Sequence, residues 1–298
     1  MPKIKTGYLN TKLIGILRTK PGTPQNHAAM AIKTAFGAGV KAVEITSNSE
    51  HWQEVVDECV KDNLNIGVGS VKNKKTALEA INHGARFLVS PGFYREPVAI
   101  ANSRKIPIIP GVYLEDEVKR ASMQGIADQK FFPASAQTHE DLYKAISEPF
   151  RDEFEELKTK KWILTSYDSE PFKKLSGKDY IEISSPTQFY EIYLSIKDKK
   201  PHAPIVIKLP EKLIGFNRLK YISELSTKEG IRTYAVGGIN KENMREVLTR
   251  YGAYGICPGS GMFDGEAILK GDFEKVRTDV QKYLEAIALL NLTSVTAL

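Results

Sequence analysis

The sequence predicts an α/β protein built as a (β/α)₈ barrel. Short apolar runs alternate regularly with amphipathic stretches, as in repeated βα units. The apolar runs are nearly continuous, which is typical of parallel strands buried on both faces. The chain has 298 residues without a compositional linker, and barrels of this class often run to about 250 residues as one unit. We therefore expect one barrel domain over residues 1–298.

The first half of the chain carries six expected strands, which lie at 13–17, 40–46, 64–68, 86–90, 106–109 and 129–132. Apolar spacing of three and four residues predicts helices between the first four strands, at 27–38, 50–62 and 75–83. Gly39 and Gly84 follow two of these helices directly, as expected of helix ends.

The second half continues the alternation with five more expected strands, at 162–165, 180–183, 204–209, 231–236 and 254–257. Helices are expected at 188–196, 213–227 and 242–250. The total of eleven strands exceeds what an eight-stranded barrel needs by three.

Composition indicates an ordinary globular protein, with 42% hydrophobic and 26% charged residues. The net charge of +6 is small for this length, and its longest basic runs, Lys72–Lys75 and Lys197–Lys200, are expected to be solvated loops. Nucleic acid is thus not an expected partner, whereas an anionic small molecule suits the charge. The two cysteines, Cys59 and Cys257, lack metal-ligand spacing. Neither a signal peptide nor a bilayer span is predicted, so we expect a cytoplasmic protein.

Lys130 is the most informative polar residue, because it lies within the apolar run Gln129–Phe132. Burying an ammonium group is costly, but it lowers the pKa of the amine and makes it a nucleophile toward carbonyls. Glu44 is likewise a charged residue within an apolar run, between Val43 and Ile45. A lysine and a glutamate that meet inside a barrel form the minimal machinery of a Schiff-base lyase. The alternatives are a lysine that reaches water at the strand edge and a glutamate that serves a structural ion pair.

Two glycine-rich turns after the last two expected strands suggest an anion site. They contain Gly237-Gly238 and Gly259-Ser260, and backbone N–H groups in such turns converge on phosphate. Barrel enzymes frequently bind phosphate at this position. Arg18 follows the first strand and is expected to contact the same anion. Two ordinary tight turns are the alternative interpretation.

Taken in order, several motifs resemble the aldolases that act on 2-keto-3-deoxy-6-phosphogluconate and 4-hydroxy-2-oxoglutarate. Each motif is short, and the resemblance depends on their common order over about 13–150 and 231–282. The motifs are Gly15-Ile16-Leu17-Arg18, Gly37-Ala38-Gly39-Val40, Val43-Glu44-Ile45-Thr46, Gly67-Val68-Gly69-Ser70-Val71, Phe87-Leu88-Val89-Ser90-Pro91-Gly92, Ile109-Pro110-Gly111-Val112, Lys130-Phe131-Phe132-Pro133-Ala134, Gly237-Gly238-Ile239 and Gly259-Ser260.

The resemblance implies a class I aldolase of carbohydrate metabolism that needs no cofactor or metal and forms homo-oligomers, commonly trimers. Such an enzyme cleaves a 2-keto-3-deoxy sugar acid, often phosphorylated, to pyruvate and an aldehyde such as glyceraldehyde 3-phosphate. By position, Lys130 would form the Schiff base and Glu44 would move protons. Ser70, Pro91 and Phe132 would face the pyruvate moiety, and Thr46 would also bind the substrate. The phosphate would be held by Arg18, Gly237, Gly238, Gly259 and Ser260, with a second carboxylate in its place as the alternative.

The chain departs from the family pattern at three places. Asn48 stands where many members carry an arginine for the substrate carboxylate, and Val236 replaces a threonine. The third departure is length, because a single crossover joins the lysine strand to the Gly-Gly strand in the family, whereas 107 positions separate Lys130 from Gly237 here. We therefore expect an inserted βαβα segment at 151–230, between the sixth and seventh barrel strands.

Lys208 is an alternative nucleophile, since it also ends an apolar strand. It lies 29 residues before Gly237, which is close to the spacing between the lysine and the Gly-Gly pair in the family. Lys130 lies 20 residues after Pro110 and has the Phe-Phe-Pro-Ala context, which favours it. Two further functions stay open at this point. One is a barrel isomerase or epimerase without a covalent intermediate, and the other is a non-catalytic sugar-phosphate-binding protein.

Overall fold

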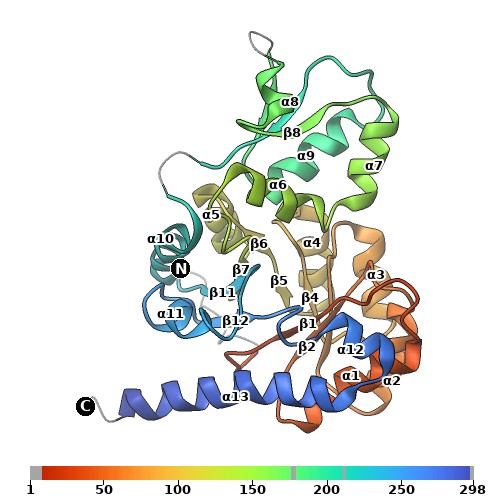
Figure 1. Cartoon of the computed structure of the whole chain (residues 1–298), viewed down its shortest axis with the longest axis vertical. Helices are drawn as coiled ribbons and strands as arrows, with labels where there is room; N and C mark the ends of the chain where they lie inside the picture. The colour runs from red at the N-terminus through yellow and green to blue at the C-terminus, as the bar shows by residue number, and fades with distance from the viewer. Residues whose placement is uncertain (1–8, 176–178, 211–212, 296–298) are drawn as a thin grey trace.

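The chain has an α/β fold with parallel sheets (Figure 1). The computed structural model describes residues 9–175, 179–210 and 213–295. Within these ranges the strands form three sheets of five, four and three strands. The first two sheets surround a common core, and the third belongs to a separate unit at the top of Figure 1.

The five- and four-stranded sheets have the orders β1-β2-β3-β4-β5 and β12-β11-β7-β6. Their strands are β1 (Gly15–Leu17), β2 (Val43–Thr46), β3 (Ile66–Gly69), β4 (Phe87–Val89), β5 (Ile108–Ile109), β6 (Gly111–Val112), β7 (Asp128–Phe131), β11 (Arg232–Val236) and β12 (Gly255–Cys257). Eight of the eleven expected strands lie here. The fifth, expected at 106–109, is observed as β5, and a further short strand, β6, follows Pro110.

The two sheets join into a barrel-like ring at both edges. Proline has no N–H to donate, so the strand ladder changes sheets at Pro110 between β5 and β6. At the opposite edge Leu13 bridges Ile256, and the backbone N–H of Ile14 donates to the Ile256 carbonyl at 3.1 Å. The ring interior is filled by buried side chains such as Phe87 and Tyr234.

Helices follow the strands on the outside of the ring (Figure 1). They are α1 (Gln25–Gly37), α2 (Trp52–Lys61), α3 (Lys74–Asn82), α4 (Arg95–Arg104), α5 (Glu115–Met123), α10 (Gly215–Lys228), α11 (Met244–Thr249), α12 (Gly265–Lys270) and α13 (Phe273–Val295). Each buries one apolar stripe; α2, for example, buries Trp52, Val55, Val56 and Cys59.

The three extra strands form their own sheet, in a unit that we call the lobe (residues 139–207). Its elements are α6 (His139–Ser147), α7 (Arg151–Thr159), β8 (Leu164–Ser166), α8 (Glu170–Lys173), β9 (Ile181–Ile183), α9 (Pro186–Ile196) and β10 (Ile205–Ile207), with the sheet order β8-β10-β9. Helix α6 packs on β8 and β10, although it precedes residue 151. Helix α10, although it lies within 151–230, packs on β11 and α5 of the ring.

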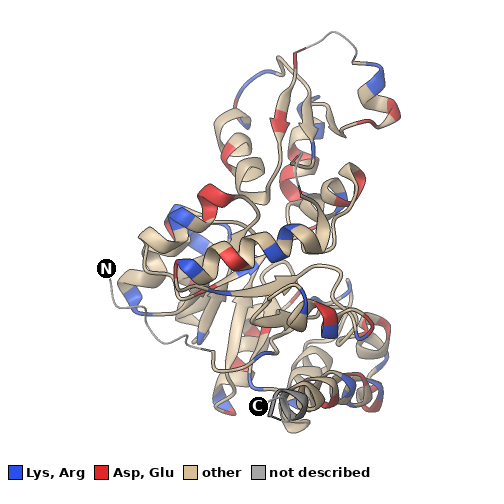
Figure 2. Ribbon diagram, turned by 90° about the vertical axis from the view of Figure 1, so that its left-hand side faces the viewer, with Lys and Arg blue, Asp and Glu red and all other residues tan. Residues whose placement is uncertain are grey.

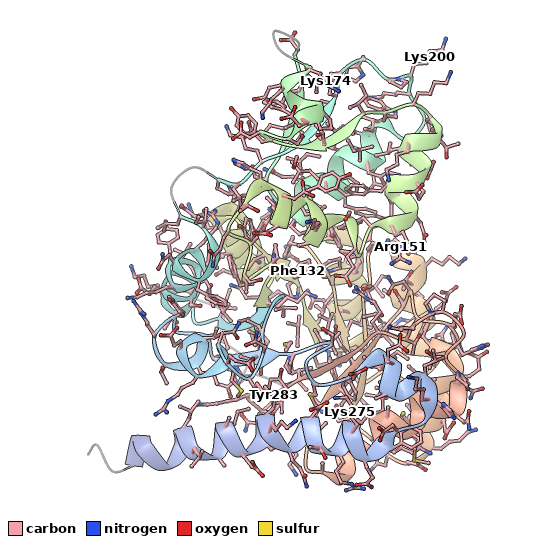
Figure 3. All side chains as sticks on the ribbon, viewed as in Figure 1. Phe132, Arg151, Lys174, Lys200, Lys275 and Tyr283 are labelled. Atoms are coloured by element: carbon pink, nitrogen blue, oxygen red, sulfur yellow. The ribbon has the colours of Figure 1, made fainter. Side chains whose placement is uncertain are left out.

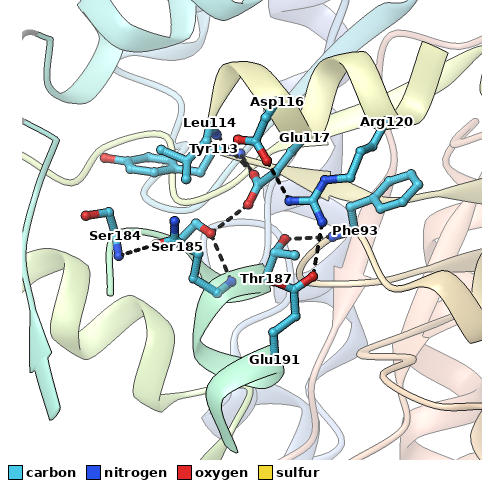
Figure 4. A network of polar contacts seen from close by, with 11 residues as sticks. Phe93, Tyr113, Leu114, Asp116, Glu117, Arg120, Ser184, Ser185, Thr187 and Glu191 are labelled. Carbon is cyan, nitrogen blue, oxygen red and sulfur yellow. Dashed lines mark hydrogen bonds and ion pairs between the residues drawn. The ribbon is translucent and has the colours of Figure 1, made fainter. Parts of the chain in front are cut away.

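A buried polar network fastens the lobe to the ring (Figure 4). Glu117 on α5 is fully buried and accepts hydrogen bonds from the backbone of Leu114 at 3.0 Å and the hydroxyl of Ser185 at 2.6 Å. Thr187 on α9 accepts from the backbone N–H of Phe93 at 2.9 Å. Burial raises the pKa of Glu117, while these donors favour its charged form.

Charged residues of both signs alternate along the helices of both units (Figure 2). One expectation for the basic runs is wrong, because Lys72 is not solvated. Its Nζ lies 2.6 Å from the Glu153 carboxylate, and only 16% of its side chain is exposed. Lys72 therefore binds α7 of the lobe through this ion pair. Among the described helices, none is long and apolar enough to cross a membrane.

Candidate active site

A cavity of about 640 Å³ opens at the carboxyl ends of the ring strands. All eleven residues expected to form the site line it: Arg18, Glu44, Thr46, Ser70, Pro91, Lys130, Phe132, Gly237, Gly238, Gly259 and Ser260. They come from segments far apart in the sequence, which the parallel strands bring to one end of the ring. Asn48 and Val236, two of the three expected departures from the family pattern, line the same cavity.

Strand alternation explains why Lys130 and Glu44 point inward. Val43 and Ile45 pack into the core between strands and helices, so Glu44 must face the ring interior. Phe131 packs into that outer core as well, and Lys130 is therefore turned inward too. Both side chains are buried, with residue exposures of 2% for Glu44 and 5% for Lys130.

Burial shifts the proton affinities of these two groups in opposite directions. It lowers the pKa of Lys130, although the negative charge of Glu44 partly opposes this shift. It raises the pKa of Glu44, opposed by the positive charges of Lys130 and Arg18. A desolvated amine next to a carboxyl group of raised pKa is the combination that imine formation and proton transfer require.

Glycine at position 69 makes room for Glu44. A Cβ at Gly69 would lie 2.5 Å from Glu44 Oε1, closer than any real contact. The next residue, Ser70, has a positive φ of 58°, a conformation that costs a non-glycine residue free energy and often occurs at functional sites. The end of β3 is thus shaped around the carboxylate of β2.

One side of the cavity lining combines apolar and hydroxyl groups. The Nζ of Lys130 lies 5.3 Å from the centre of the Phe132 ring. The hydroxyl of Thr46 is fixed by the hydroxyl of Ser49 at 3.0 Å. Pro91 and Ser70 complete this side of the lining.

The two glycine turns after β11 and β12 also line the cavity. Gly237 and Gly238 have positive φ values of 94° and 68°. The carbonyl of Gly238 is held by the side-chain amide of Asn243 at 2.8 Å. Arg18 lines the cavity as well and forms an ion pair with Glu148 of the lobe.

Lys208, the alternative nucleophile, does not line this cavity. It directly follows β10, the last strand of the lobe, and its Nζ lies 3.5 Å from Glu182 and 4.9 Å from the centre of the Tyr167 ring. The structure thus brings Lys130, not Lys208, together with Glu44.

Sequence reasoning did not identify several residues of the lining. Lys20, Glu50 and Cys257 follow or belong to strands, and their position after an apolar run was the available signal. Glu148 and Arg151 come from the lobe, and no local pattern marks them. Figure 3 places Phe132 within the ring and Arg151 where the lobe meets the ring.

The described residues contain no group of three or more His, Cys, Asp or Glu side chains placed to hold a metal ion. Cys257 is buried in the cavity wall, and burial raises its pKa well above the ordinary thiol value. The polar groups of the cavity are two lysine amines, two guanidinium groups, carboxylates, hydroxyls, the Asn48 amide, the Cys257 thiol and backbone amides.

Comparison with known proteins identifies similar chains. The sequence model of KDPG and KHG aldolase matches residues 6–154. A protein of Escherichia coli (strain K12) named KHG/KDPG aldolase is 30% identical over 148 residues, which cover 47% of this chain and 70% of that protein. A 2-dehydro-3-deoxy-phosphogluconate aldolase of Dickeya dadantii is 32% identical over 127 residues, covering 42% of this chain and 59% of the relative.

A solved structure extends the likeness to most of the fold. The crystal structure of KDPG aldolase from Legionella pneumophila, with pyruvate captured as a covalent carbinolamine intermediate, superposes with a TM-score of 0.58. The match covers 91% of this chain and 93% of that chain at 18% identity, so it concerns the fold.

Proposed function

Because the chain belongs to the family of KDPG and KHG aldolases, we propose that it is a class I aldolase in which Lys130 forms the Schiff base. It cleaves a 2-keto-3-deoxy sugar acid, in phosphorylated form, to pyruvate and an aldehyde such as glyceraldehyde 3-phosphate. The observation that carries the proposal is the burial of Lys130 beside Glu44 at the bottom of the cavity.

The reaction begins with the free amine of Lys130, which attacks the C2 carbonyl of the keto acid. The resulting carbinolamine loses water and leaves a protonated imine on Lys130. A base then removes the proton of the C4 hydroxyl, the C3–C4 bond breaks, and its electron pair moves into the imine to give an enamine. The aldehyde leaves at this stage.

In this proposal Glu44 moves the protons of these steps. In its charged form it accepts a proton, and its raised pKa lets it return that proton to C3 of the enamine. Water then hydrolyses the imine, which releases pyruvate and restores the amine. Thr46, Ser70, Pro91 and Phe132 surround the pyruvyl group in this scheme.

The anionic end of the aldehyde half is assigned to the two glycine turns. Backbone amides at Gly237, Gly238, Gly259 and Ser260 bind a phosphate there, and Arg18 contributes positive charge. Support comes from the positive φ values of Gly237 and Gly238, which open their N–H groups toward an anion. A phosphate on Arg18 competes with Glu148 for the guanidinium group.

We further propose that the whole fold is a (β/α)₈ barrel into which the lobe is inserted between its sixth and seventh strands. Support comes from the separate sheet β8-β10-β9 and from the family match, which ends at residue 154. A homo-oligomer, a trimer by family resemblance, and a cytoplasmic location complete the proposal. Both cysteines are free, which suits a reducing compartment. Light scattering on the purified chain tests the oligomer.

The decisive experiment is borohydride reduction in the presence of pyruvate, followed by peptide mapping. We expect a reduced pyruvyl adduct on Lys130 in the wild type and in Lys208→Ala, and none in Lys130→Ala. An adduct on Lys208 would move the site to the lobe. No adduct on either lysine, in protein shown to be folded, would refute the aldolase mechanism and favour an isomerase or a sugar-phosphate-binding protein.

A further inference from the structure

We propose that Arg151, which the lobe contributes to the cavity, binds the carboxylate of the 2-keto acid substrate and selects for it. This inference rests on the proposed aldolase function. It gives the lobe a direct part in substrate recognition, because Arg151 begins α7 and no ring strand carries it.

The place of Arg151 follows from the contacts on either side of it. Glu148 forms an ion pair with Arg18, which directly follows β1. Glu153 forms an ion pair with Lys72, which follows β3. Since β2 lies between β1 and β3 in the sheet, the segment that carries Arg151 crosses the carboxyl end of β2. We call residues 148–151 the roof segment.

The roof segment is held firmly at this position. Lys72 donates a hydrogen bond to the carbonyl of Pro149 at 3.1 Å, and its Nζ lies 5.2 Å from the centre of the Phe150 ring. Phe150 is fully buried and packs against Phe189 of the lobe at 5.0 Å between ring centres. Arg151 is therefore an exposed side chain on a fixed backbone.

The charges of the cavity single out the same residue. Four cations line it, and two of them are neutralised: Arg18 by Glu148 and Lys20 by Glu266. Lys130 is buried beside Glu44 and is the proposed nucleophile. The guanidinium group of Arg151 makes no ion pair or hydrogen bond with any described residue, so its planar set of donors is available to a bidentate anion.

The chemistry of the substrate indicates which anion Arg151 meets. The carbonyl carbon that Lys130 attacks is bonded directly to the carboxylate carbon, so this carboxylate must lie close to the Schiff base. The glycine turns occupy the side of β11 and β12, and the roof segment covers the side of β2. The β2 end itself offers Thr46 and the uncharged Asn48. Arg151 supplies the positive charge that this end lacks.

The test compares two carbonyl probes in borohydride trapping, pyruvate and its neutral amide, pyruvamide. Both form an imine with Lys130, but only pyruvate carries the carboxylate. We expect Arg151→Gln to raise the pyruvate concentration needed for half-maximal trapping about 10- to 100-fold, the loss of a hydrogen bond to a charged group. Trapping of pyruvamide should not change, and Arg151→Lys should restore part of the pyruvate response.

Arg245→Gln is the matched control, since Arg245 is an exposed helical arginine outside the cavity. Its trapping of both probes should equal that of the wild type. Wild-type pyruvate trapping in Arg151→Gln would overturn the inference, and so would an equal loss with both probes. Failure of the proposed function gives a different result, because the wild type would then trap neither probe.

Discussion

At the level of single residues, the reactivity proposed for Lys130 depends on its burial. A buried amine loses its proton at a lower pH than an exposed lysine, because desolvation destabilises the ammonium form. The rate of trapping therefore rises with pH through this lowered pKa and levels off above it. Glu44 is the group that opposes the shift most strongly.

Glu44→Gln is expected to separate the two roles of the pair. Without the carboxylate charge the pKa of Lys130 falls further, so the rising limb of the trapping profile should move to lower pH. Turnover of the sugar acid should fall by about 10²- to 10⁴-fold, the usual contribution of a general acid–base group. The measurements are borohydride trapping against pH and steady-state kinetics. A limb that moves to higher pH would contradict the described electrostatics.

Gly69→Ala tests whether the position of Glu44 matters at fixed chemistry. The added Cβ would lie 2.5 Å from Glu44 Oε1, so the carboxylate must move. We expect kcat to fall at least about tenfold, since misplaced catalytic groups lose rate steeply. Pyruvate trapping at Lys130 should persist.

The control for this substitution is Gly37→Ala. A Cβ at Gly37 meets no atom within 4 Å, and alanine favours the helix by about 1 kcal/mol over glycine. Its kinetics should match the wild type. Equal kinetics for Gly69→Ala and the wild type would show that Glu44 does not need its present position.

At the level of elements, the turn after β11 holds the proposed phosphate site. Alanine at Gly238 would be strained by the positive φ of 68°, and its Cβ would lie 2.0 Å from Ser135 Oγ. We expect Gly238→Ala to raise the KM for a phosphorylated keto acid about tenfold or more, while pyruvate trapping stays unchanged. The control is Gly125→Ala, because Gly125 has a similar φ of 67° and a Cβ there meets no atom within 4 Å. It introduces the same backbone strain outside the cavity, so its KM should equal that of the wild type.

Much of the ring was predictable from the sequence, because most of its strands coincide with a short apolar run that ends in a polar residue or glycine. Apolar runs near β1 to β4, β7, β11 and β12 indicated the strands, and the polar residue at each end indicated the site. Pro110 is an instructive difference, since the expected strand 106–109 continues beyond the proline as β6. Strand pairing resumes at Gly111, which lies opposite Lys130 of β7. Only glycine fits there, because a Cβ would lie 2.1 Å from the Pro91 carbonyl oxygen.

The lobe was only partly predictable. The strands β8, β9 and β10 coincide with the three expected runs in excess of eight, but nothing local indicated that they form a separate sheet. Glu148 and Arg151 occur in an ordinary charged stretch. Their place in the cavity depends on contacts such as Lys72 with Glu153, which are 81 positions apart and leave no mark in the periodicity.

At the level of the whole molecule, the lobe and the ring share a buried interface and should unfold together. Thr187→Val removes the acceptor for the Phe93 N–H and leaves that donor buried. We expect the free energy of unfolding to fall by about 1–3 kcal/mol. Thr249→Val, on an exposed helix face, should change it by less than about 0.5 kcal/mol.

Calorimetry and chemical denaturation measure this prediction. A single transition that moves to lower temperature in Thr187→Val agrees with one cooperative unit. A separate early transition of the lobe, with the ring unaffected, would show that the Glu117 network does not couple the two units.

The lobe leaves and re-enters the ring at one connection, between β7 and β11, and its sheet is hydrogen-bonded to neither ring sheet. Substitutions in the roof segment therefore leave untouched the strand register that presents Lys130 and Glu44 to each other. Under the proposed mechanism, selection can alter which molecules the entrance admits without rebuilding the reaction centre. The enzyme is in this sense modular, with chemistry inherited in the strands and substrate choice free to evolve in a single excursion of the chain.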